Sequence, residues 1–302
     1  MRVLMIFFDG WGLGANDPST NPFLTNPMPT LRALFDGTMP TNGNGHFDST
    51  HATLVPTDAT LGVPGLPQSA TGQTAIFTGI NAPRAIGEHL GPYPNAALRK
   101  MLAEDNLFQR LVAANRRVAF ANAYPPIFFE RLARGKARRS ATSYAAFAAD
   151  VRYRDLDDLR AGRAVSAYLS NERWRELGAD VPLITAYQAG QNLARLANEH
   201  DLTLFEYFLT DAAGHKGEPA FTAFVLDEID ELLRGAIDGM NLSESLILTT
   251  SDHGNLEDTS AKAHTLNPVP TLLIGAGREK IAPRLHALTD LTPALVDLLL
   301  EK

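Results

Sequence analysis

Three aspartates and three histidines that could bind divalent metals follow apolar segments of this 302-residue chain, and one serine accompanies them. Carboxylate and imidazole groups suit borderline divalent ions such as Zn²⁺ or Mn²⁺, whereas calcium favours oxygen alone and soft ions favour sulfur. Seven groups are too many for one tetrahedral ion and fit two ions, which can bind both oxygens of a phosphoryl displacement. The candidate ligands are Asp9, Ser69, Asp211, His215, Asp252, His253 and His264.

Ser69 is the candidate nucleophile of this set. A loop punctuated by Pro64, Gly65 and Pro67 leads to it, and the residues that follow predict a helix over 70–79. A hydroxyl at a helix N-terminus lies where free N–H groups and the helix dipole favour an anion, and metal binding makes a serine hydroxyl easier to deprotonate. The alternative is that Ser69 only caps the helix, because serine is a preferred N-cap.

The other candidates also have structural interpretations. Asp9 could cap a turn, Asp252 could form an Asx turn, and Asp211 with His215 could be an ordinary pair at a helix start. The aspartates, with His215 and His253 close behind two of them, nevertheless come shortly after apolar segments. We therefore expect these groups to converge on a metal site.

The elements that must position these groups alternate between strands and helices. The strands are continuously apolar, which is typical of strands covered on both faces. We therefore expect an α/β fold with a mostly parallel central sheet, helices on both faces and the site beyond the carboxyl ends of the strands. The turn-rich, polar stretch 36–60 predicts a loop. Strands are predicted over 2–8, 117–124, 202–209, 245–249 and 271–274, and helices over 30–35, 94–114, 186–199, 219–237 and 291–300.

Residues 126–185 differ in character, with many basic residues followed by a charged run over 152–163. We interpret this stretch as a small inserted cap over the strand ends, with 1–125 and 186–302 forming the metal-binding core. Its basic cluster is either a solvated helix face or part of a clamp for the substrate phosphate. The cluster comprises Arg131, Arg134, Lys136, Arg138 and Arg139.

The composition of the chain limits the kinds of partner that it can bind. The 45% hydrophobic content supports a sizeable core, and the net charge of −7 argues against nucleic acid or an anionic membrane. The lack of cysteine excludes disulfides and thiolate metal sites. The apolar run 3–8 is too short for a signal-peptide core or a membrane span. We expect a cytoplasmic protein that binds a small phosphorylated substrate, with its oligomeric state left open.

Several spaced motifs resemble the alkaline phosphatase superfamily, above all the branch with cofactor-independent phosphoglycerate mutase and phosphopentomutase. The resemblance covers about residues 1–90 and 186–300, and Ser69-Ala-Thr-Gly72 is similar to the nucleophile segment. It implies an alkaline phosphatase-like fold and a transient phosphoserine at Ser69. The motifs are Phe8-Asp-Gly-Trp-Gly12, Asn26-Pro-Met-Pro-Thr30, Asp211-Ala-Ala-Gly-His215, Ser251-Asp-His-Gly-Asn255 and Ala263-His-Thr-Leu-Asn-Pro-Val-Pro270. The implied ligand sets are Asp9, Ser69, Asp252 and His253 for one metal, and Asp211, His215 and His264 for the other.

Two departures from the mutases affect the expected reaction. Gln73 stands where both mutases have histidine, and roughly sixty to a hundred residues are available here for an insertion, fewer than the mutase uses to retain released phosphoglycerate. A mutase must exclude water so that the phosphoryl group returns to its intermediate. We therefore expect a two-metal phosphohydrolase that acts on a small phosphate ester through Ser69. The alternative is a phosphomutase, an isomerase, and a third possibility is a non-enzymatic, metal-stabilised binding protein.

Overall fold

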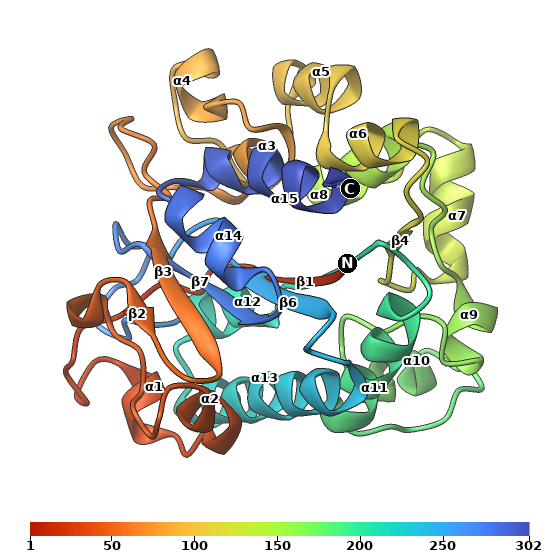
Figure 1. Cartoon of the computed structure of the whole chain (residues 1–302). Coiled ribbons are helices and arrows are strands. Elements are labelled where there is room, and N and C mark those ends of the chain that lie inside the picture. Colours follow the sequence, from red (N-terminus) through yellow and green to blue (C-terminus); the bar gives the residue numbers. More distant parts are fainter. Residues whose placement is uncertain (302) are drawn as a thin grey trace.

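This computed structural model describes residues 1–301, so Lys302, the last residue of the predicted core, lies outside the described residues. A seven-stranded sheet in the order β2-β3-β7-β6-β1-β5-β4 forms the centre of the molecule (Figure 1). Strands β6, β1, β5 and β4 run parallel, whereas β7, β3 and β2 are joined by antiparallel pairing. The predicted α/β fold with a mostly parallel core is confirmed. The strands are β1 (Arg2–Phe8), β2 (Phe47–Asp48), β3 (Ala52–Thr57), β4 (Val118–Phe120), β5 (Leu202–Tyr207), β6 (Ser245–Thr250) and β7 (Val269–Gly275).

Helices cover both faces of this sheet (Figure 1). One face carries α3, α6, α8 and α15, and the other carries α2, α11 and α13. The helices are α1 (Pro22–Thr25), α2 (Pro29–Leu34), α3 (Ser69–Thr78), α4 (Ala82–Ile86), α5 (Ala96–Glu104), α6 (Leu107–Ala113), α7 (Pro126–Ala133), α8 (Ala141–Ala148), α9 (Leu156–Arg160), α10 (Glu172–Glu176), α11 (Ala186–Ala197), α12 (Leu209–Lys216), α13 (Pro219–Gly239), α14 (Arg278–Ile281) and α15 (Leu291–Leu300).

Strand β1 shows why the central strands are apolar throughout. Val3 and Met5 pack in the cluster that contains α3 and α15, whereas Leu4 and Ile6 pack in the cluster that contains α11 and α13. Successive side chains of a strand point to opposite faces. Because both faces are covered, all four side chains are fully buried.

The prediction of a loop over 36–60 was wrong for residues 52–57, which form β3. This strand pairs with β7, and Pro56 lies opposite Pro270 in the register. The polar residues of this pair satisfy one another, since Thr57 Oγ1 lies 2.8 Å from Thr271 Oγ1. Pro56 and the turn-rich residues around the segment gave it the composition of a loop, whereas β7 supplies the partners that make it a strand.

The stretch 126–185 contains α7, α8, α9 and α10. Helix α8 packs beside α3 and α6 in the hydrophobic cluster that contains α3 and α15. A smaller cluster around Leu159 and Trp174 lies in the rest of the stretch. Its role as a cap stays a prediction. Among residues 1–301, the structure has no helix of the length and apolarity that a membrane span requires.

Candidate metal centre

Three adjacent parallel strands, β6, β1 and β5, bring the candidate ligands to one edge of the sheet. Asp9 follows β1, Asp252 and His253 follow β6, and Asp211 lies in the first turn of α12 directly after β5. Parallel strands place their carboxyl ends together, so residues distant in sequence meet there. His264 belongs to the loop that leads from β6 into β7, the antiparallel neighbour of β6.

His253 lies between the candidate nucleophile and two carboxylates. Its Nε2 is 3.1 Å from Ser69 Oγ, 3.3 Å from Asp9 Oδ1 and 3.6 Å from Asp252 Oδ1. His253 and Asp252 are fully buried, and Ser69 is 7% exposed at the first position of α3. Asp9, Asp252 and His253 each offer a ligand atom within 4.8 Å of the others. This group is one candidate metal triad.

His264 is the centre of a second group. Its Nε2 is 3.2 Å from His215 Nε2 and 3.5 Å from Asp211 Oδ1, and its ring stacks on that of His253 with the centroids 3.7 Å apart. Asp211, His253 and His264 form the second triad whose ligand atoms lie within 4.8 Å of one another. The structure thus brings all seven predicted ligands to one place, with His253 within reach of both groups.

Hydrogen bonds orient the donor atoms of the second group. His264 Nδ1 lies 2.7 Å from the carbonyl oxygen of Pro67, so Nδ1 carries the proton and Nε2 keeps a free lone pair. The side chain of Asn255 donates to Asp211 Oδ1 at 2.7 Å. Both ligands are therefore held in place by residues outside the ligand set, as is usual for metal sites.

The electrostatics of the centre fit bound cations. Asp9 Oδ1 is buried and accepts no hydrogen bond. Burial, followed by the nearby carboxylates of Asp211 and Glu206, raises the pKa of Asp9 well above its ordinary value. Burial and the charge of Asp9 likewise raise the pKa of Asp252, against the opposing effect of His253. A divalent cation removes this cost by neutralising the carboxylates, and mixed N/O donors suit a borderline ion.

Burial also keeps a histidine of the centre neutral. Desolvation, followed by the charge of His253, lowers the pKa of His264 to about 4. A neutral imidazole is the form that binds metals. His264 therefore remains a competent donor well below neutral pH.

Glycines allow the backbone to approach the ligands closely. A Cβ at Gly72 would lie 2.7 Å from the carbonyl oxygen of Asp252. Gly10 has a φ of +71°, and a Cβ there would lie 2.8 Å from Asp211 Oδ1. Both positions therefore require glycine, one for space and the other for space and conformation.

Gln73 is a functional residue that the sequence marked only as a departure. Its side-chain nitrogen donates to Asp252 Oδ2 at 3.1 Å, and its side-chain oxygen accepts from Thr142 Oγ1 at 3.2 Å. Gln73 is 1% exposed. It therefore fixes the Asp252 carboxylate and ties the metal centre to α8.

Glu257 was missed by sequence reasoning. This buried carboxylate accepts hydrogen bonds from Gly12 N at 3.0 Å, from Asn255 N at 2.7 Å and from the side chain of Asn267 at 3.0 Å, and Thr265 also donates to it. It therefore joins the loop after β1 to both ends of the loop that carries His264. Its place two residues after Asn255 was the one available signal.

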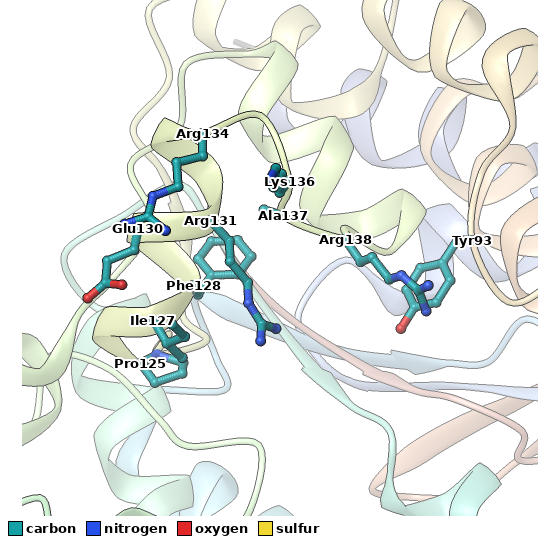
Figure 2. Close-up of a pocket in the computed structure, with 10 residues that line it drawn as sticks. All are labelled: Tyr93, Pro125, Ile127, Phe128, Glu130, Arg131, Arg134, Lys136, Ala137 and Arg138. Atoms are coloured by element: carbon teal, nitrogen blue, oxygen red, sulfur yellow. The ribbon is translucent and has the colours of Figure 1, made fainter.

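The structure separates the five basic residues of the predicted cluster into two sets. Arg139 stacks on the rings of Tyr144 and Phe147, with its guanidinium carbon 4.7 Å and 4.1 Å from their centroids. The other members line a single cavity (Figure 2). They are Arg131, Arg134, Lys136 and Arg138.

Comparison with known families and sequences agrees with this centre. The family model described as the metalloenzyme superfamily matches residues 1–301. The 2,3-bisphosphoglycerate-independent phosphoglycerate mutase of Acetivibrio thermocellus is 32% identical over 127 residues, which are 39% of this chain and 24% of that protein. That of Cereibacter sphaeroides is 31% identical over 126 residues, which are 39% of this chain and 25% of that protein. The matches thus span about a quarter of the length of these relatives.

Solved structures share the fold at low identity. A protein from Pyrococcus horikoshii gives a TM-score of 0.59 at 16% identity, covering 100% of this chain and 98% of that one. The alkaline phosphatase of the Antarctic bacterium TAB5 gives a TM-score of 0.54 at 12% identity, covering 99% of both chains. The predicted alkaline phosphatase-like fold is therefore confirmed.

Proposed function

The chain belongs to the metalloenzyme superfamily, and from that premise we propose that it is a two-metal phosphohydrolase that acts on a small phosphate ester through a phosphoserine on Ser69. The observation that carries the proposal is the position of Ser69 Oγ, 3.1 Å from His253 Nε2 at the start of α3. This placement puts a hydroxyl beside two groups of metal-binding side chains and at the positive end of a helix dipole.

The proposed ligands are Asp9, Asp252 and His253 with Ser69 for one ion, and Asp211, His215 and His264 for the other. The fit rests on the uncompensated oxygen of Asp9 and on the mixed N/O donor set. Mn²⁺ or Zn²⁺ suits these donors and supplies charge stabilisation for the nucleophile and the leaving oxygen when bound.

Ser69 has the central role in the reaction. Its Oγ attacks phosphorus in line, so that the Oγ–P bond forms while the bond from phosphorus to the ester oxygen breaks. Water then attacks the phosphoserine, Oγ leaves, and the sum is ester plus water giving alcohol plus phosphate. The buried carboxylate of Asp252 and the part-buried carboxylate of Asp9 would hold one ion, and Gln73 holds Asp252 in orientation.

Access of water favours hydrolysis over return of the phosphoryl group. The cavity beside the centre opens to solvent, with Tyr93 46% and Ile127 49% exposed. The second candidate function is a phosphomutase, which the similarity to phosphoglycerate mutases supports. A phosphomutase shares the first half-reaction, the attack by Ser69. It differs in the second, where a hydroxyl of the retained intermediate accepts the phosphoryl group in place of water.

Phosphorus NMR of metal-loaded protein tests the proposal. Separate samples contain 3-phosphoglycerate, ribose 1-phosphate and phenyl phosphate, with metal-stripped protein and Ser69→Ala beside the parent. Inorganic phosphate that requires both Ser69 and metal establishes a hydrolase. An isomeric ester without free phosphate establishes the mutase, and no product from any substrate contradicts both. The exposed serine in Ser243→Ala serves as the matched control, with unchanged activity.

A further inference from the structure

A cavity of about 550 Å³ lies between α7, the loop that follows it and Tyr93 (Figure 2). Figure 2 shows Arg131 extending from α7 into the space that faces Arg138 and Tyr93, whereas Arg134 turns toward Glu130. Four basic side chains and a single carboxylate, Glu130, line the cavity. Its lining therefore carries a net positive charge on a chain whose total charge is −7.

The cations of this cavity are not neutralised by the protein. Among the described residues, none of the four basic side chains lies within ion-pair distance of a carboxylate. Basic residues further along the same stretch are paired: Arg152 and Arg163 both contact Asp158, at 2.5 Å and 3.2 Å, and Arg173 contacts Glu176 at 2.8 Å. The charges of Arg152, Arg163 and Arg173 are thus used in ion pairs within the protein, and those of the cavity remain available for an anion.

The cavity also offers an apolar surface. Phe128 and Ile127 line it from α7, and Tyr93 lines it from the opposite side, with the Arg138 guanidinium carbon 5.7 Å from the Tyr93 ring centroid. The ring of Phe128 stacks on Tyr124 with the centroids 4.1 Å apart, which holds it in place. A ligand that fits this lining combines an anion with a flat apolar body.

Two walls of the cavity adjoin the proposed metal centre. Tyr93 lies two residues after Gly91, where a Cβ would be 3.3 Å from Ser69 N. Arg138 lies two residues before Ser140, which donates to Glu206 at 3.1 Å, and the carboxylate of Glu206 is close enough to Asp9 to raise the pKa of Asp9. The chain segments that supply these two walls therefore continue to the surroundings of Ser69 and, through Glu206, of Asp9.

We propose that this cavity binds the leaving group, and that the substrates are phosphate monoesters with a flat apolar leaving group that carries a second anion. This inference rests on the proposed function, because it assigns the phosphoryl group to the metal centre. The second anion, a carboxylate or another phosphate, contacts Arg131 and Arg138, while the apolar body lies against Tyr93 and Phe128.

Paired ligands test the proposal. Phenyl phosphate and 4-carboxyphenyl phosphate differ only in the second anion, and calorimetry on metal-loaded Ser69→Ala gives their affinities without turnover. We expect 4-carboxyphenyl phosphate to bind about tenfold more tightly, which corresponds to one charge-assisted contact. Replacing its carboxylate by a second phosphate should keep the preference. Equal affinities for phenyl phosphate and 4-carboxyphenyl phosphate would overturn the inference.

Charge variants in the Ser69→Ala background locate the contact. Arg131→Gln and Arg138→Gln should each remove most of the preference, and Glu130→Gln should increase it, a gain that structural damage cannot produce. Arg99, an exposed cation on α5 outside the cavity, gives the matched control Arg99→Gln with an unchanged preference. A preference that survives both arginine substitutions also overturns the inference.

Turnover by the parent protein separates this inference from the proposed function. Equal release of phosphate from both esters, with equal affinities, refutes the leaving-group cavity and keeps the hydrolase. Tighter binding of 4-carboxyphenyl phosphate that depends on Arg131 and Arg138, without release of phosphate or an isomer, keeps the cavity and refutes the phosphoryl chemistry.

Discussion

Replacing Asp252 by asparagine should stabilise the metal-free protein while removing the stabilisation that metal gives. Asp252 is fully buried, and its carboxylate accepts from Gln73 at 3.1 Å and from Gly10 N at 3.3 Å. Asparagine keeps the size of the side chain and one carbonyl oxygen to accept from Gly10. Its amide nitrogen faces Gln73, whose amide must turn so that its oxygen accepts from the new asparagine while its nitrogen donates to the Thr142 hydroxyl. With that rotation the substitution removes mainly the charge, which faces Asp9 in the same triad.

The magnitude follows from the spacing of the triad. Ligand atoms of Asp9 and Asp252 lie within 4.8 Å of each other. At that distance and an effective dielectric constant of about 20, two unit charges repel by about 3 kcal/mol. For a chain of this size about 2 °C corresponds to 1 kcal/mol, so the metal-free variant should melt about 6 °C higher than the parent at pH 8.

The pH dependence of this gain has a definite sign. The pKa of Asp252 is raised in the folded protein, first by burial and then by Asp9. A raised pKa means that folding favours the protonated acid, so the charge penalises folding above the folded-state pKa. The penalty disappears as the pH falls to about 4, the ordinary value of an aspartate. The gain of Asp252→Asn should therefore be largest at high pH and vanish near pH 4.

Differential scanning calorimetry in EDTA and then with Mn²⁺ or Zn²⁺ measures both effects. A ligand that binds only the folded state raises its stability by mass action, so the parent should gain stability with metal and Asp252→Asn should lose most of that gain. Asp227→Asn changes an exposed carboxylate on α13, and it should alter neither the stability of the metal-free protein nor the gain in stability with metal. A metal-free variant that melts lower than the parent and keeps the full metal-induced gain would refute this reasoning.

Three other substitutions test the residues that support the centre. Gln73→Glu replaces the amide 3.1 Å from Asp252 Oδ2 by a carboxylate, which at the same dielectric constant should cost the metal-free protein about 5 kcal/mol at pH 8 and less at pH 5, measured by thermal unfolding. Glu257→Gln replaces a carboxylate oxygen that accepts from backbone N–H groups by an amide NH₂ that cannot accept. Urea unfolding should show that the free energy of unfolding falls by about 3 kcal/mol. Gly72→Ala forces a Cβ against the Asp252 backbone. We expect the free energy of unfolding to fall by about 2 kcal/mol and elemental analysis to show a lower metal content. Unchanged values would contradict each assignment.

The central strands and their covering helices could be predicted because their signals are local. Continuous apolar runs such as Val3–Phe8 appear only where both faces of a strand are buried. The strand β3 could not be predicted this way, since Pro56 cannot donate to a strand ladder and the stretch around the strand is turn-rich and polar. Its pairing with β7, more than 200 residues further along the chain, supplies the hydrogen bonds that its sequence does not reveal.

The convergence of the candidate metal ligands could be predicted because it follows from residue type and from position after a strand. Gln73 and Glu257 could not, because their roles depend on partners elsewhere in the chain. An amide becomes a positioning group only when α8 brings Thr142 to one end of it and β6 brings Asp252 to the other. A carboxylate such as Glu257 becomes a junction only when the loop after β1 and both ends of the loop between β6 and β7 present donors to it.

The metal centre does not by itself distinguish hydrolysis from mutase chemistry, because both begin with attack by Ser69. The distinction depends on whether water or a retained alcohol reaches the phosphoserine. In this chain α8 packs into the core beside α3, which leaves α7 and its basic loop as the wall of the adjoining cavity. Tyr93 and Ile127, about half exposed, open that wall to solvent. The balance between the two reactions therefore depends on residues around 126–138, and substitutions there should shift the products while metal binding stays intact.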